Sequence, residues 1–200
     1  RHGAAIVQYP HQPRRRGRHA ELQTAEQRRG ATRPCALPAH GAPALKVTPI
    51  VTDLAAKTAE VTVEAAVVGA QNVTFALEGQ TLTAPIEKGT AKVVFTLNNA
   101  HLWDGVDDPF LYTVSAKLDN GEETSARFGC RKFEIDPQKG FILNGREYPL
   151  RGVSRHQDRK GAGNALTNEM MEEDISIILE MGANTIRLAH YQHAQYFYDL

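Results

Sequence analysis

The 200-residue chain has no long apolar run and few cysteines. No uninterrupted apolar stretch reaches about 18 residues, and no charged start leads into an apolar segment, which excludes an ordinary membrane-spanning helix and a visible signal peptide. Cys35 and Cys130 are too few for a disulfide framework and too far apart for a zinc site, so we expect a reducing compartment and a cytoplasmic, bacterial protein. Because the chain opens with Arg1 in place of Met, we expect the true N-terminus upstream, which leaves secretion open.

Lysine is absent from the first forty residues, which hold eight arginines and two glutamates, a net charge of +6. The remaining residues carry fifteen basic and twenty-one acidic side chains, a net charge of −6. The first forty also contain four of the ten prolines and a single aromatic residue, Tyr9, without helical or strand periodicity. Such a segment buries too little apolar surface to offset its ordering entropy, so we expect residues 1–44 to be disordered.

Three interpretations of this basic segment stay open. The run Arg14-Arg15-Arg16-Gly17-Arg18 could bind phosphates of nucleic acid or a membrane surface. It could instead be a flexible tail, or a stretch of GC-rich DNA translated out of frame, since that yields Arg, Ala, Pro, Gly and His without Lys. We favour the last two and expect neither nucleic acid nor a membrane as a partner.

From residue 45 to 136 the apolar residues alternate with polar ones in short segments, the pattern of an antiparallel sheet with one buried face. Turn signals separate the segments, the strongest being Asp119-Asn120-Gly121. About seven short strands in this length predict an immunoglobulin-like β-sandwich. The residues expected to face its core are Val61, Val63, Ala65, Val67, Val73, Phe75, Leu77, Val93, Phe95, Leu97, Tyr112, Val114, Ala116 and Leu118.

The pattern changes over residues 137–200. Asn144-Gly145 suits a type I′ turn and predicts a small hairpin. The elements expected after it are a strand near 150–154, a helix over 168–181, a strand over 183–189 and a helix beginning near Tyr196. Met171, Ile175, Ile178 and Leu179 form the apolar stripe of the first helix, and Gly182 lies where its C-terminal cap belongs. One strand-helix-strand unit with parallel strands is therefore predicted.

Two histidines lie where these two strands end. In a parallel barrel the loops at the carboxyl ends of the strands gather around one cavity, and His156 and His190 follow the first and the second strand. Neutral imidazole can hydrogen-bond a sugar hydroxyl. A competing hypothesis is a zinc or iron site built from His156, Asp158, His190 and His193, although the short loop spacing is a weak signal. We expect His193 and Gln192 to be solvent-facing loop residues.

The chain resembles glycoside hydrolase family 2 in five motifs that occur in the family's order over residues 45–200. They are Leu102-Trp103-Asp104-Gly105 with Asp108-Pro109-Phe110-Leu111-Tyr112; Arg127-Phe128-Gly129-Cys130-Arg131; Gly140-Phe141-Ile142-Leu143-Asn144-Gly145; Arg151-Gly152-Val153-Ser154-Arg155-His156-Gln157-Asp158; and Gly182-Ala183-Asn184-Thr185-Ile186-Arg187 with His190-Tyr191. The Arg-His-Gln-Asp and Leu-Ala-His-Tyr forms look like the β-galactosidase branch.

The resemblance implies a fragment: an immunoglobulin-like sandwich over 45–136 and the first βαβ unit of a (β/α)8 TIM barrel over 137–200. It implies that His156, His190, Arg187 and Asp158 contact a β-galactoside substrate, although Arg187 could equally be an ion-pair partner inside the barrel. Retaining hydrolysis needs two carboxyl groups about 5 Å apart, which the family carries on later strands, so we expect no activity from this chain.

The resemblance also implies Mg²⁺ and Na⁺ for a longer parent enzyme that is a homo-oligomer, and no cofactor in this fragment. The alternative function is a stand-alone immunoglobulin-like binding module with a basic disordered arm. The predicted βαβ unit argues against that alternative, because one such unit alone leaves strand edges and the apolar stripe of its helix uncovered.

Overall fold

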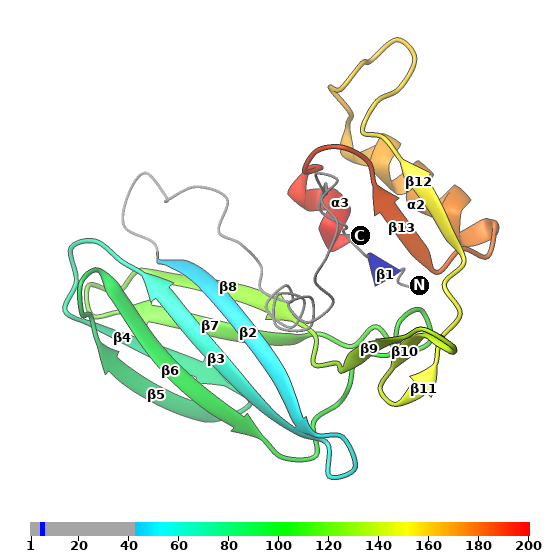
Figure 1. Cartoon of the computed structure of the whole chain (residues 1–200). Coiled ribbons are helices and arrows are strands. Elements are labelled where there is room, and N and C mark those ends of the chain that lie inside the picture. The colour runs from blue at the N-terminus through cyan, green and yellow to red at the C-terminus, as the bar shows by residue number, and fades with distance from the viewer. Residues whose placement is uncertain (1–4, 7–42) are drawn as a thin grey trace, which may run out of the picture. The chain divides into compact units, whose positions relative to one another are not determined.

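The computed structural model describes residues 5–6 and 43–200, which fall into two compact units (Figure 1). The first unit contains residues 43–103 and 110–132, and the second contains residues 5–6, 104–109 and 133–200. Most of the segment predicted to be disordered, 1–44, lies outside the described residues. Within it, Ala5–Ile6 forms the short strand β1, and Ala44 already begins the next strand. No helix in the described part of the chain is long and apolar enough to span a membrane.

Seven strands form the first unit as two antiparallel sheets, which confirms the predicted immunoglobulin-like sandwich. One sheet has the order β2-β3-β6 and the other the order β5-β4-β7-β8. Pro49 lies on β2, an edge strand, where a missing amide donor is tolerated. The strands are β2 (Ala44–Asp53), β3 (Thr58–Ala66), β4 (Asn72–Leu77), β5 (Gln80–Pro85), β6 (Thr90–Leu97), β7 (Tyr112–Leu118) and β8 (Glu123–Phe128).

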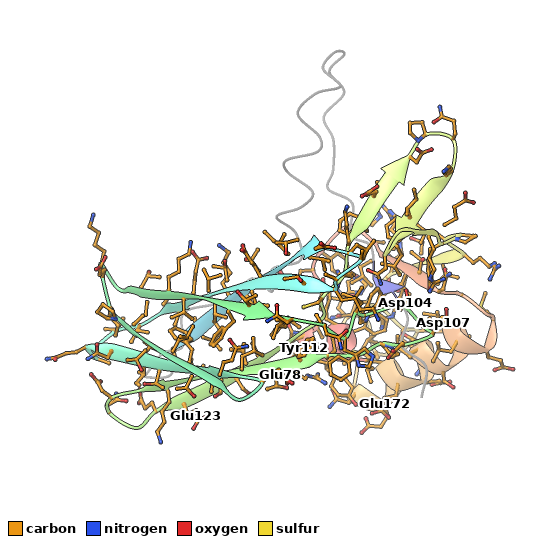
Figure 2. All side chains as sticks on the ribbon, turned by 90° about the horizontal axis from the view of Figure 1, so that it is seen from below. Glu78, Asp104, Asp107, Tyr112, Glu123 and Glu172 are labelled. Atoms are coloured by element: carbon orange, nitrogen blue, oxygen red, sulfur yellow. The ribbon has the colours of Figure 1, made fainter. Side chains whose placement is uncertain are left out.

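The two sheets share one apolar core. Alternation along each strand buries one face, and thirteen of the fourteen residues predicted to line the core are buried, Val93 being partly buried against it. Figure 2 shows the side chain of Tyr112, whose hydroxyl accepts a hydrogen bond from the His101 amide at 2.6 Å. Cys130 is fully buried in the same core, and this burial raises the pKa of its thiol to about 11, so the thiol stays protonated at neutral pH.

A three-stranded hairpin sheet opens the second unit, with strands β9 (Phe133–Asp136), β10 (Gly140–Leu143) and β11 (Arg146–Glu147). Asn144 and Gly145 have φ values of 49° and 81°, as the predicted type I′ turn requires. The sequence predicts that the sandwich ends at residue 136. In the structure Phe133–Asp136 already belong to the second unit, because β9 pairs along its whole length with β10.

The predicted strand-helix-strand unit follows as β12 (Gly152–Arg155), α2 (Asn168–Glu180) and β13 (Thr185–Leu188), and a short helix α3 (Gln195–Asp199) ends the chain. β12 and β13 are parallel neighbours, and β1 pairs with the other edge of β13. Met171, Ile175 and Ile178 of the helix pack with Ile186 and Leu188 of β13 in a second core. Gly182 has a φ of +74°, as a residue just past a helix end often does.

Candidate functional site

The two histidines predicted from the sequence lie together at the carboxyl ends of β12 and β13. The ring centroids of His156 and His190 are 5.0 Å apart, with the ring planes inclined by 56°. Both residues are exposed. They meet because their strands are parallel neighbours whose registers bring Arg155 opposite Leu188, so that both strands end at one level. Two imidazoles at this spacing can each hydrogen-bond a separate hydroxyl group of one small polar ligand.

His190 has a strained backbone. Its φ is +67°, and the Tyr191 amide donates to the Ala189 carbonyl at 2.9 Å across it, which makes His190 the centre of a γ-turn with positive φ. Such a conformation costs about 1 kcal/mol or more for a residue with a β-carbon, and it persists only when surrounding contacts hold it. The contacts of this loop therefore decide where the His190 ring lies.

The other two predicted site residues are placed differently. Arg187 is exposed on the face of β13 opposite to the buried Ile186, and its Nη1 donates to the Ser154 hydroxyl at 3.2 Å. Asp158 is exposed in the loop after β12. Among the described residues no hydrogen bond or ion pair joins Asp158 to either histidine or to Arg187. The structure thus brings His156 to His190 and Arg187 to Ser154, and it leaves Asp158 apart.

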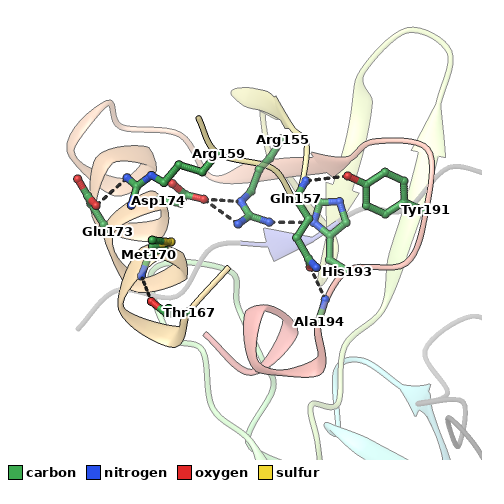
Figure 3. Close-up of polar contacts among 10 residues, drawn as sticks. All are labelled: Arg155, Gln157, Arg159, Thr167, Met170, Glu173, Asp174, Tyr191, His193 and Ala194. Atoms are coloured by element: carbon green, nitrogen blue, oxygen red, sulfur yellow. Dashed lines mark hydrogen bonds and ion pairs between the residues drawn. The ribbon is translucent and has the colours of Figure 1, made fainter. Parts of the chain in front are cut away.

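Hydrogen bonds join the loop after β12 to the loop after β13 (Figure 3). The Gln157 amide donates to the Tyr191 hydroxyl at 3.2 Å, and the Gln157 side-chain oxygen accepts from the Ala194 amide at 2.5 Å. The Ala189 amide donates to the Arg155 carbonyl at 2.9 Å. Gln157 therefore contacts the second loop on both sides of His193.

Arg155 makes the most extensive contacts in this region. Its Nε and Nη2 donate to one Asp174 oxygen on α2 at 2.9 and 2.7 Å, and Nη1 lies 3.0 Å from Nδ1 of His193 (Figure 3). The guanidinium carbon lies 3.8 Å from the centroid of the Phe197 ring. With 6% of its side chain exposed, this cation is buried but paired, as a buried charge must be.

His193 corrects our expectation of a solvent-facing loop residue, because it is buried, with 4% of its surface exposed. Since guanidinium can only donate, Nδ1 accepts and the neutral ring carries its hydrogen on Nε2. Burial, and then the charge of Arg155, lower the pKa of His193, and the Ala189 carbonyl opposes the shift only in part. Gln192 is exposed, as expected.

The sequence analysis did not predict the contacts among Arg155, Gln157, Asp174 and His193. One signal was available for Arg155. Strand alternation places it on the same side of β12 as Val153, towards the helix, where a charge requires a partner, and Asp174 lies in the second turn of that helix. Nothing local identifies His193 as the next partner.

The site contains no pair of catalytic carboxylates within the part of the chain that the structure describes. Four glutamates lie on α2, where Figure 2 labels Glu172, and Glu147 lies on β11, away from the strand ends. Nor do the described residues contain three His, Cys, Asp or Glu side chains grouped to hold a metal ion. The proposed metal set is not supported, because His193 directs Nδ1 at the cation of Arg155.

Two family models match nearly all of the described chain. Residues 42–131 match the model described as "Glycosyl hydrolases family 2", and residues 133–200 match "Glycosyl hydrolases family 2, TIM barrel domain". The boundary between the two matches coincides with the start of β9, where the second structural unit begins.

Curated relatives include enzymes of two specificities. A β-glucuronidase of Bacteroides fragilis is 47% identical over 108 residues, covering 52% of this chain and 16% of the relative. A β-galactosidase of Bacteroides ovatus is 36% identical over 135 residues, covering 62% of this chain and 16% of the relative. The chain therefore spans about a sixth of the length of these relatives.

The similar solved structures also include a β-glucuronidase and a putative β-galactosidase. The FMN-binding β-glucuronidase from Facaelibacterium prausnitzii L2-6 superposes with a TM-score of 0.70 at 41% identity, covering 79% of this chain and 26% of that one. A putative β-galactosidase from Bacteroides fragilis gives a TM-score of 0.64 at 35% identity, covering 78% and 26%.

Proposed function

The chain belongs to glycosyl hydrolases family 2, and from this we propose that it is a segment of a retaining enzyme that cleaves a terminal β-glycoside. In this proposal His156 and His190 hydrogen-bond hydroxyl groups of the terminal sugar. The observation that carries it is their 5.0 Å pairing at the carboxyl ends of two parallel strands, where barrel enzymes place their active sites.

Arg187 and Asp158 have secondary places in the proposal. Arg187 lies on the exposed face of β13, the strand that leads to His190, and bonds the Ser154 hydroxyl, so we assign it to the floor of the pocket. Asp158 is carried over from the family motif alone, and it would need a loop movement to join the histidines. The match of residues 133–200 to a barrel domain disfavours the alternative of a stand-alone immunoglobulin-like module.

We propose a β-galactoside as the substrate, on the Arg-His-Gln-Asp motif that ends at Asp158. A β-glucuronide is the second candidate, favoured by the 47% identity to a β-glucuronidase. The Mg²⁺ and Na⁺ that the resemblance implies would be held by residues outside this chain, and a homo-oligomeric parent is part of the same proposal.

The test is a titration of the 200-residue chain with D-galactose and, separately, with D-glucuronate, followed through the ring ¹H–¹³C signals of its histidines. We expect one sugar to shift the ring signals of His156 and His190 but not those of His101. His101 is the control, because it lies in the sandwich, where its ring stacks on Phe110 with centroids 4.0 Å apart. The sugar that shifts them identifies the substrate. Equal shifts at His101, or no shift with either sugar, would contradict the assignment.

A second measurement concerns catalysis. Because no pair of carboxyl groups flanks the histidines within the described residues, the purified chain is expected to leave aryl β-galactosides and aryl β-glucuronides intact. Hydrolysis that co-purifies with the chain and disappears in a His156→Ala, His190→Ala variant would refute this.

A further inference from the structure

We propose that Arg155 is a positioning residue, which holds His156 and His190 in their paired arrangement by joining the two loops that carry them. The identity of the ligand that the two rings bind rests on the proposed function. The joining itself follows from the contacts of Arg155, which precedes His156 directly and reaches the loop that carries His190 through His193.

The guanidinium is fixed from three sides. Asp174 accepts from Nε and Nη2, the Phe197 ring covers one face at 3.8 Å, and the remaining Nη1 points at Nδ1 of His193. With its plane fixed in this way, the direction of Nη1 is determined by the helix and not by the loop. A lysine ammonium could keep the ion pair with Asp174, but it lacks the planar guanidinium that bonds Asp174 and His193 through separate nitrogens.

This connection between the two loops matters because the backbone of His190 is strained. A residue held at a φ of +67° relaxes to negative φ when its loop is released, and that rotation turns the ring away from His156. The loop is held on one side by the Ala189 amide, bonded to the Arg155 carbonyl, and on the other by His193 and Ala194. Among these bonds, Arg155 alone contacts a residue before His190, Ala189, and a residue after it, His193. Gln157 contacts only residues after His190.

Arg159 supplies the matched control. Its Nη2 contacts Glu173 on the same helix at 2.6 Å, so it also ties the loop after β12 to α2 (Figure 3). This pair is much more exposed, and it does not reach the loop of His190. An Arg159→Lys variant therefore changes an arginine to a lysine between the same two elements without touching the proposed connection.

The experiment compares Arg155→Lys with Arg159→Lys in the full 200-residue chain, without sugar. Two signals are recorded: the nuclear Overhauser effect between the His156 and His190 ring protons, and hydrogen exchange at the Ala194 amide. We expect Arg155→Lys to weaken the ring-to-ring effect severalfold and to accelerate Ala194 exchange about tenfold, the factor for losing one hydrogen bond to a charged group. Arg159→Lys should change neither.

Ala194 exchange that rises no more than exchange at Ile178 in α2 would show a merely structural role and overturn the proposal. So would an unchanged ring-to-ring effect. If Arg155→Lys fails to fold, His193→Phe decides, because it removes the acceptor of Arg155 Nη1, leaves Arg155 paired with Asp174, and should produce the same two changes. Absence of sugar binding would overturn the proposed function and leave these readouts intact, so the two failures can be told apart.

Discussion

The ion pair between Arg155 and Asp174 allows a quantitative test of what holds the second unit together. Asp174→Asn removes the negative charge and leaves the Arg155 cation, 6% exposed, without its counter-charge. Breaking a buried ion pair in this way costs about 3–5 kcal/mol. Because Asp174 itself is 27% exposed, water offsets part of the loss, and we expect the free energy of unfolding of this unit to fall by about 2–3 kcal/mol.

Glu173→Gln is the matched control, one residue earlier on the same helix. Its partner Arg159 is 33% exposed and Glu173 is 56% exposed, so this pair contributes less than about 1 kcal/mol. The two substitutions are chemically alike and differ in burial, which is the variable under test.

Urea unfolding with two optical probes measures both variants. Within the described residues α2 and α3 lie in the second unit, so circular dichroism at 222 nm reports on it, whereas Trp103 fluorescence reports on the sandwich. Asp174→Asn should shift the 222 nm transition to lower urea and leave the Trp103 transition in place. Equal shifts for Asp174→Asn and Glu173→Gln would refute the assignment of the stability to the buried pair.

Two further predictions concern the same unit, the first with a control in the sandwich. Gly105→Ala should cost several kcal/mol, because Gly105 has a φ of +69° and an added β-carbon would clash with the Tyr148 side chain. Gly121→Ala, in the sandwich, has a φ of +94° and open space around it and should cost only about 1 kcal/mol; similar losses in the thermal unfolding midpoint would contradict this. The pKa of His193 is lowered on folding, so the unfolded chain takes up a proton that the folded one does not, and the stability of this unit should fall as the pH drops below the ordinary value of about 6.5. His193→Asn should flatten that dependence in urea titrations between neutral and acidic pH, and an unchanged slope would count against it.

Much of the fold followed from short-range patterns. Alternation at Val61, Val63, Phe75 and Phe95 identified the buried face of the sandwich, and Asn144-Gly145 identified a hairpin turn. These features can be predicted from the sequence because they depend on interactions between residues close together along the chain. The resemblance in five ordered motifs identified the family, which the matches over 42–131 and 133–200 confirm.

The details of the site depended on contacts between distant residues. The sequence alone suggested His156 and His190 because each follows a strand, but their 5.0 Å spacing exists only through the parallel pairing of β12 with β13. Likewise, we expected His193 to face solvent, since a histidine in a short polar loop has no local signal for burial.

What the sequence by itself determined, then, was the sandwich, the strand-helix-strand unit, the two histidines after its strands and the family, but neither β1 nor the pairing of β9. The tertiary structure decided the start of the second unit at Phe133, the burial of His193 and the role of Arg155. The physical reason is that Arg155 and His193 are 38 residues apart, and their bond forms only after β13 has paired with β12 and α2 has packed over both. No local pattern encodes a contact that depends on those two events together.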